Sequence, residues 1–322
     1  MREGLKAASV FIGTVIGAGF ATGKEVALYF GKTAPVIAVF SGLLLGFLCS
    51  FFMHIGKISG GENFNGFLLK KRKGVVDAIL FICAFITFTA MFSGAEVLIR
   101  STFGISHIGI PTVIAAAVIA VKGLKSLKTL NSLLVPVIVV LIAVIFVRCG
   151  RVSKEGGYNF LNGIAYAALN IMLAGAVMVR LGAGASDKTI ASAGVVSGVV
   201  LAVILGMIAL IVTGRESMSM PMFEAAKSVG LKNVSGILIF ASVFTTMVSA
   251  LELAAQKFRA FVPDKRLSAL TVCLMAYPVV LIFEFDEIVA YFYPVVSVFG
   301  VLMLIVALIR YAALKLNAGK IP

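Results

Sequence analysis

Long apolar runs, separated by short polar segments, recur along the whole chain of 322 residues. Each run has about 17 to 25 residues, the length that a helix needs to cross a hydrocarbon core about 30 Å thick. The fourth run is the weakest, because its uninterrupted apolar part is short and contains Pro111. The pattern predicts ten membrane-spanning helices, at residues 5–31, 34–56, 75–101, 105–121, 129–148, 160–181, 189–213, 233–256, 267–283 and 287–312.

The composition fits this pattern. Hydrophobic residues make up 61% of the chain and charged residues only 13%, a balance that is foreign to soluble domains of this size. We therefore predict an all-α membrane protein. The four cysteines, Cys49, Cys83, Cys149 and Cys273, lie in or at the ends of apolar runs and lack the spacing of a metal site. We interpret them as small apolar residues.

The formal net charge of +14 follows the predicted topology. With a cytoplasmic N-terminus, 19 of the 28 Lys and Arg residues fall in inner segments, in line with the positive-inside rule. Without the fourth span, Lys122, Lys125 and Lys128 would lie outside. We expect a multi-pass protein of the bacterial plasma (inner) membrane with both termini cytoplasmic and no nucleic-acid partner. The inner residues are Arg2, Lys6, Lys57, Lys70, Lys71, Arg72, Lys73, Lys122, Lys125, Lys128, Arg180, Lys188, Lys257, Arg259, Lys265, Arg266, Arg310, Lys315 and Lys320.

The first span contains the glycine-rich stretch GTVIGAGFATG at residues 13–23. Each glycine weakens a helix by roughly 1 kcal/mol relative to alanine. The stretch predicts a break at residues 16–23. Backbone groups freed at membrane depth cost several kcal/mol each unless another helix, water, an ion or a solute satisfies them.

The chain divides near residue 155 into two halves of five spans, residues 1–155 and 156–322. An odd number of spans inverts the second half relative to the first. The first span of the second half also carries weak points at mid-depth, Asn170 and Gly175. Interrupted segments in matching positions of inverted halves indicate a transporter binding site. The alternative is that these small residues only allow close helix packing.

The segment at residues 13–20 resembles the glycine-rich motif in the first helix of amino acid–polyamine–cation superfamily transporters, which share the LeuT fold. The extended form IGAGFATGKE, at residues 16–25, is most similar to the YkvI-like small bacterial membrane proteins. The resemblance implies ten helices in a LeuT-like 5+5 inverted repeat, broken helices 1 and 6, and transport by alternating access.

A break of this kind exposes two helix ends. The N–H groups of the second half-helix, at Ala18, Gly19 and Phe20, suit a carboxylate, and the carbonyls that end the first half-helix suit a cation. Glycine at 17 and 19 permits close approach, so a zwitterion fits both ends. Phe88 and Tyr166 are candidates to pack over it, although aromatic residues in such helices also serve as core or lipid contacts. The predicted solute-binding residues are Gly17, Ala18, Gly19, Phe20, Phe88, Tyr166, Asn170 and Gly175.

The eighth span offers a cation site. Ser242, Thr245 and Thr246 are spaced to share one helix face. The resemblance implies a sodium ion between the two threonine hydroxyls, the Ser242 carbonyl, and carbonyls of Gly13 and Ile16. The alternative is that these hydroxyls bond back to their own helix. In some relatives of the fold, a lysine of the fifth span takes the cation position and links transport to protons. Here the fifth span has no ionisable residue within 129–147, which by this resemblance favours sodium, whereas Glu96 and Glu252 leave proton coupling open.

Charged residues at the outer helix ends suggest a gate. Lys24 and Glu25 lie in the outer half of the first span, and Asp286 and Glu287 open the tenth. A pair between Lys24 and either acid would close over the site, the alternative being four solvated helix-end charges. Residues 218–229, with Pro221 near the start, predict a short amphipathic helix that serves as an outer lid or a surface loop.

We therefore expect a secondary active transporter, a sodium-coupled or less favourably proton-coupled symporter of an amino acid or related zwitterion. The alternatives are a sensor or receptor subunit that keeps the fold without transport, and a channel. The sequence lacks the paired acid–base, nucleophile or phosphate-binding motifs of an enzyme. We expect the lipid bilayer and a small solute as partners, and no cofactor apart from sodium as a coupling ion.

Overall fold

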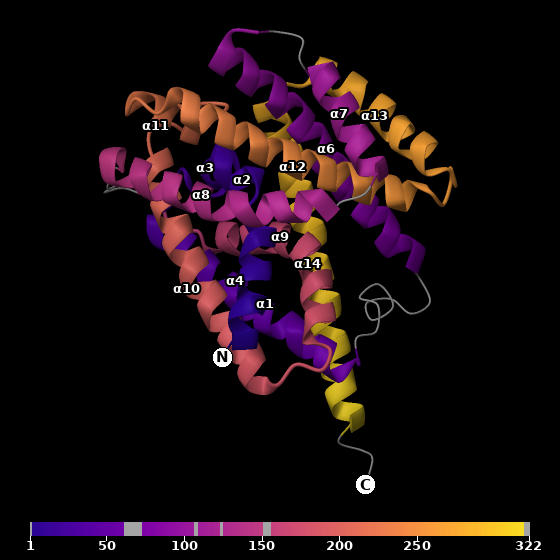
Figure 1. The fold of residues 1–322 in the computed structure, drawn as a ribbon. Helices are drawn as coiled ribbons and strands as arrows, with labels where there is room; N and C mark the ends of the chain where they lie inside the picture. Colours follow the sequence, from indigo (N-terminus) through magenta and orange to yellow (C-terminus); the bar gives the residue numbers. More distant parts are fainter. Residues whose placement is uncertain (1, 61–72, 106–108, 123–124, 151–155, 319–322) are drawn as a thin grey trace.

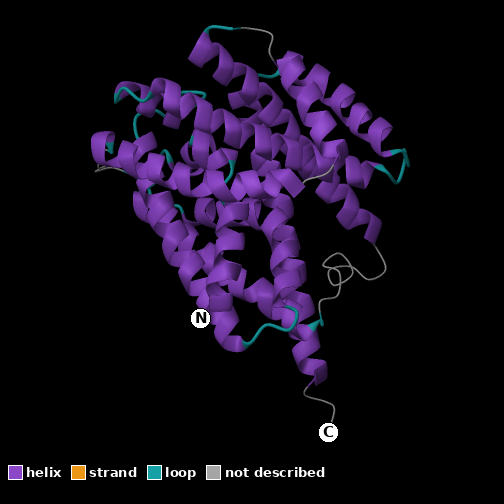
Figure 2. Ribbon diagram, in the orientation of Figure 1, coloured by secondary structure: helices purple, strands orange, loops and turns teal. Residues whose placement is uncertain are grey.

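The computed structural model describes residues 2–60, 73–105, 109–122, 125–150 and 156–318 (Figure 1). Every regular element drawn in Figure 2 is a helix, and an isolated bridge joins Thr33 to Gly157. The helices are α1 (Arg2–Val15), α2 (Ala18–Thr22), α3 (Lys24–Phe30), α4 (Pro35–Ile58), α6 (Lys73–Phe103), α7 (Gly109–Lys122), α8 (Lys125–Cys149), α9 (Phe160–Gly182), α10 (Asp187–Val212), α11 (Pro221–Ser228), α12 (Lys232–Phe258), α13 (Lys265–Ile282) and α14 (Phe285–Ala318).

The helix bounds follow the apolar runs of the sequence to within a few residues. Six described helices are long and apolar enough to cross a membrane, and the two arms of α9, which meet at a 65° bend, would make a seventh span. The chain is therefore a multi-pass membrane protein. The predicted fourth span is α7, whose 14 residues reach only about 21 Å at 1.5 Å per residue. The total of ten spans remains a prediction.

Helices from the two predicted halves pack against each other. α4 lies against α10, and α6 lies against α12. α1 also packs on α10, as α9 packs on α4, so these contacts recur when the halves are exchanged. An inverted repeat produces such paired contacts. The division itself remains a prediction, since the boundary at residue 155 lies outside the described residues, as do the inner cations Lys70, Lys71, Arg72 and Lys320.

Small residues bring α4 and α10 into backbone contact, and Figure 1 shows the two helices side by side. A Cβ on Gly46 would collide with the backbone of Gly198, and a Cβ on Gly42 would collide with that of Ala202. Without side chains between them, the helices gain dispersion contacts that larger residues would prevent. We call the contact of Gly42 and Gly46 with Gly198 and Ala202 the glycine seam.

Candidate solute site at the helix break

The predicted break in the first span is confirmed. α1 ends at Val15 and α2 begins at Ala18, with Gly17 between them in an extended conformation (φ −126°, ψ −152°). The Ile16 N–H still donates to the Ile12 carbonyl at 2.8 Å, and the ladder resumes where the Ala21 N–H donates to the Gly17 carbonyl at 3.2 Å. The interruption therefore lies at residues 16–18, within the predicted segment.

A second interruption follows at Gly23, which has a φ of +74°. This left-handed conformation favours glycine. A Cβ there would also stand 2.6 Å from Met222 in α11. The outer part of the span is thus two short helices, α2 and α3, whereas the sequence analysis expected one half-helix after the break.

Thr246 of α12 bonds to one of the backbone groups that the break leaves without a helical partner. The Ala18 N–H donates to its hydroxyl at 3.3 Å, and a Cβ on Gly17 would lie 3.3 Å from the same oxygen. This contact occupies one N–H group that the sequence analysis assigned to a solute carboxylate. Because α2 has only five residues, the predicted anion site at Ala18, Gly19 and Phe20 has little helix dipole behind it.

The other members of the predicted cation set lie close by. The Thr245 hydroxyl donates to the Ser242 carbonyl at 3.1 Å, which is the back-bonded alternative. Ile16 is buried at the end of α1, and Gly13 is half-buried about one turn earlier. The structure thus brings Thr246 to the break, while the sodium role of the five residues remains a prediction.

Glu25 turns inward. A Cβ on Gly19 would overlap the Glu25 carboxylate, so this acid lies against the break, whereas the sequence analysis placed it in the outer gate. Its charge also acts on the phenols of Tyr29, Tyr166 and Tyr293. The predicted solute site therefore contains a carboxylate of the protein itself.

Aromatic side chains from α2, α3 and α9 pack together near this carboxylate. Tyr166 is fully buried, with its ring centroid 5.0 Å from that of Phe30, 5.6 Å from that of Tyr29 and 6.5 Å from that of Phe20. The Tyr29 hydroxyl is 2.6 Å from that of Ser297 in α14. Sequence reasoning named Phe20 and Tyr166 but missed Tyr29 and its partner. The signal was a tyrosine near the outer end of an apolar span, where a phenol needs a hydrogen-bond partner.

The second half contributes Tyr166, Asn170 and Tyr293. The hydroxyls of Tyr166 and Tyr293 are buried and lack a partner in hydrogen-bonding geometry within the described ranges. The Asn170 amide donates to the Tyr166 carbonyl at 3.0 Å, and its side chain also approaches the Tyr166 phenol. Sequence reasoning missed Tyr293, which lies in the apolar run of α14.

Lys24 closes the outer side of the site. This buried side chain donates to the carbonyls of Glu216 at 3.4 Å and Met218 at 3.0 Å, in the loop that leads into α11. Asp286 acts on Lys24 electrostatically and accepts a hydrogen bond from Ser219 at 3.2 Å. α11 confirms the predicted short helix.

The predicted gate pair is not formed as such. Among the ion pairs of the described residues, none joins Lys24 to Asp286 or Glu287. Glu287 accepts instead from the Glu284 N–H at 2.9 Å, at the start of α14. Lys24 holds the outer loop through main-chain carbonyls.

The structure places four other predicted residues on α6, α9 and α12. Phe88 is fully buried on α6 beside Phe92, with ring centroids 6.4 Å apart. A Cβ on Gly175 would meet the Phe52 ring at 3.2 Å, so this glycine serves close packing of α9 on α4. Glu96 accepts from the Gly109 N–H and so ties α6 to α7. Glu252 is half-buried on α12.

The ionic contacts between helices were not anticipated. Lys257 of α12 pairs with Asp77 of α6. The pair joins two neighbouring helices on the side predicted to be cytoplasmic. Both residues lie near helix ends, where the sequence indicates only a preference for charged side chains.

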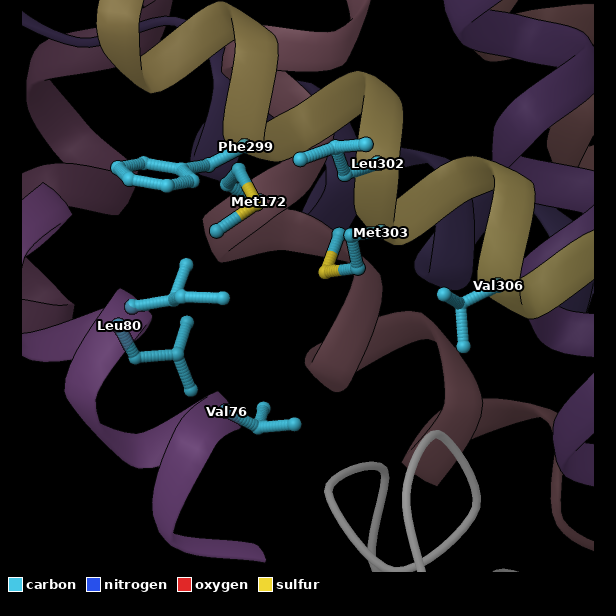
Figure 3. Close-up of a pocket in the computed structure, with 8 residues that line it drawn as sticks. Val76, Leu80, Met172, Phe299, Leu302, Met303 and Val306 are labelled. Carbon is cyan, nitrogen blue, oxygen red and sulfur yellow. The ribbon is translucent and has the colours of Figure 1, made fainter. Parts of the chain in front are cut away.

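A cavity lies between α6, α9 and α14 on the side predicted to be cytoplasmic (Figure 3). Its volume is about 80 Å³. Met172, one of its lining residues, stands directly before the 65° bend of α9. The apolar side chains that line it are Val76, Ile79, Leu80, Met172, Phe299, Leu302, Met303 and Val306.

Two curated proteins of Bacillus subtilis strain 168 are similar in sequence, although no protein-family model matches the chain. The uncharacterized membrane protein YkvI is 26% identical over 285 residues, which cover 80% of this chain and 82% of YkvI. The uncharacterized protein YyaD is 25% identical over 338 residues, which cover 98% of each chain.

Solved structures show the fold. MhsT in complex with L-phenylalanine is 17% identical with a TM-score of 0.66, and the match covers 95% of this chain and 88% of MhsT. A manganese transporter of Eremococcus coleocola is 16% identical with a TM-score of 0.60, over 96% and 78%. The inward-facing conformation of Mhp1 is 14% identical with a TM-score of 0.55, over 94% and 70%. The chain has the LeuT fold that these transporters share.

Proposed function

We propose that this protein is a secondary active transporter that carries a small solute across the bacterial plasma membrane by alternating access. The observation that carries the proposal is the break at Gly17, where Thr246 replaces a lost main-chain partner within a LeuT fold. An interrupted span of this kind, facing a second bent span, is a typical solute site of secondary transporters. The protein would act on its solute without chemical change and without a cofactor.

The solute class follows from the groups at the break. We propose an amino acid or related zwitterion, since backbone polar groups, hydroxyls and a carboxylate gather there beside aromatic rings. Within the described ranges, no group of three or more His, Cys, Asp or Glu side chains could hold a metal ion. This favours an organic solute over a transition metal such as the one for which the Eremococcus coleocola neighbour is named.

Alternating access requires one side to close while the other opens. Lys24 ties the outer loop to α3, and the described cavity lies on the opposite side, against the bend of α9. With both termini in the cytoplasm, as the charge distribution favours, these features support an inward-facing arrangement. Opening the outer side would then require Lys24 to release its two carbonyls.

Reconstitution tests the proposal. Proteoliposomes containing the full chain should accumulate a radiolabelled amino acid when a sodium gradient is imposed, and lose this accumulation when the gradient is collapsed. Accumulation driven only by a proton gradient would show that the coupling ion is the proton and not sodium. Solute binding without flux under either gradient would contradict transport and assign the chain to a sensor.

Thr246→Ala is expected to raise the sodium concentration for half-maximal uptake by roughly tenfold, about 1.4 kcal/mol. The change removes one oxygen from the proposed sodium shell and the partner of the Ala18 N–H. The measurement is initial uptake against sodium concentration at fixed solute. Ser249→Ala is the control, because its hydroxyl donates to the Thr245 carbonyl one turn further along the helix. Unchanged sodium dependence in Thr246→Ala would remove α12 from the cation site.

A further inference from the structure

Glu25 places a carboxylate at the break without a cationic partner. No ion pair of the described residues includes it, although its side chain is only partly exposed and lies against Gly19. The neighbouring Lys24 donates away from it, to the outer loop. A carboxylate at membrane depth is costly unless a positive group compensates it. A positively charged group beside Gly19 would therefore stabilise the ionised form of Glu25.

Two buried phenolic hydroxyls lie near Glu25. Tyr293 is 3% exposed and Tyr166 is fully buried, and neither phenolic hydroxyl has a partner in hydrogen-bonding geometry among the described residues, although the Asn170 side chain approaches that of Tyr166. Both phenols lie within the electrostatic reach of Glu25. A buried hydroxyl without a partner loses about 1–3 kcal/mol relative to a bonded one. A ligand that bonds to both would recover this loss.

The rings add a further property. Phe20, Tyr29 and Phe30 pack around Tyr166 with centroids 5.0–6.5 Å away. Aromatic faces attract a cation within about 6 Å of the ring centroid. The lining thus combines one negative charge, two hydroxyl oxygens and several ring faces.

Of the ligand groups that this lining can receive, an organic ammonium matches it best. An ammonium has three donors, and Glu25, Tyr166 and Tyr293 offer three acceptors. Its remaining surface, the carbon chain, can lie on the rings. An anionic group would be repelled by Glu25, and a divalent metal would need more carboxylate or imidazole ligands than the described part of the chain gathers.

We propose that Glu25, Tyr166 and Tyr293 bind the protonated amino group of the transported solute. The inference extends the proposed function and rests on it in one respect, namely that the bound solute is transported. It places the amino group beside Gly19, where the sequence analysis expected a carboxylate. Selectivity then depends on the amino group, and a solute carboxylate is accessory.

Matched solutes test this assignment on the purified full chain in detergent. The chain has no Trp but has buried thiols at Cys49, Cys83 and Cys273, so a thiol-reactive dye reports unfolding. Three sets each contain a zwitterion, its amine and its carboxylate: alanine, ethylamine and propionate; leucine, isoamylamine and 4-methylpentanoate; phenylalanine, phenethylamine and 3-phenylpropionate. In at least one set, the two amino-bearing members should raise the Tm by about 3 °C or more, and the carboxylate should not.

Single substitutions test which side chains the amine-dependent Tm shift requires. Glu25→Gln keeps the shape of the side chain and should weaken the amine-dependent shift at least tenfold in solute concentration. Tyr293→Phe removes only the orphan hydroxyl and should weaken the shift less. Glu3→Gln is the matched control, because Glu3 is exposed on α1 and forms an exposed ion pair with Lys6. Its response should equal that of the unaltered protein.

The outcomes separate the two proposals. The amino-group site is overturned if the carboxylates stabilise as well as the amines, if no amine in the three sets shifts the Tm, or if Glu25→Gln responds fully. It is also overturned if sodium chloride alone, compared with potassium chloride, gives the only Glu25-dependent shift. Amine binding without flux in proteoliposomes would contradict transport and keep the site.

Discussion

Gly19→Leu is expected to abolish solute binding and uptake. A Cβ at position 19 would overlap the Glu25 carboxylate, and the rest of a leucine side chain would extend further into the position that this carboxylate occupies. The carboxylate cannot stay in place, so the charge that we assign to the solute amino group is displaced. We expect a loss of at least about 100-fold in affinity, about 2.7 kcal/mol. Solute-dependent Tm shifts and uptake measure it.

A smaller substitution tests whether the loss of binding is due to misfolding. Gly19→Ala adds only the Cβ and should weaken binding while the Tm without solute stays close to that of the unaltered protein. Gly74→Leu is the control, because a Cβ on Gly74 meets open space at the start of α6. Normal binding in Gly19→Leu would place the pocket elsewhere.

Gly46→Leu is expected to destabilise the fold by about 3 kcal/mol or more. A Cβ at this position would meet the backbone of Gly198 and the Gly194 carbonyl, and main-chain atoms cannot rotate away as a side-chain tip can. The glycine seam would have to open along its length, with loss of the dispersion contacts between α4 and α10.

Dye-detected unfolding measures this effect, since Cys49 lies buried near the seam on α4. Phe47→Leu is the control, because Phe47 is on the same helix but 63% exposed. A Gly46→Leu protein that unfolds at the normal temperature would show that the two helices are further apart than the seam requires.

The sequence predicts the helices and the main break because both depend on local properties. Apolar runs bounded by polar segments mark the helices, and the glycines at 13, 17, 19 and 23 mark the segment that leaves the helical path. Thr246 was also predictable, since its spacing with Ser242 places it on one face of α12, although only the resemblance to a known family directed that face at the first span.

The interior of the site could not be predicted, because helix orientation is a tertiary property. In a membrane, lipid-facing and buried positions are both apolar, so the pattern does not show which face of α14 presents Tyr293. Glu25 was misplaced for a related reason. The turn at Gly23 changes the direction of α3, and an unbroken half-helix would have carried the acid to another side.

The short helix α3 connects the two sides of the site. It lies between Gly23 and Gly31, and its first two residues point to different neighbours: Lys24 to the outer loop and Glu25 to Gly19. One peptide bond therefore joins Glu25, the proposed ligand of the solute, to Lys24, which holds the outer loop. A tilt of α3 on binding of a positively charged group at Glu25 would therefore also strain the hydrogen bonds from Lys24 to the outer loop. Solute binding and opening of the outer side are then coupled through α3.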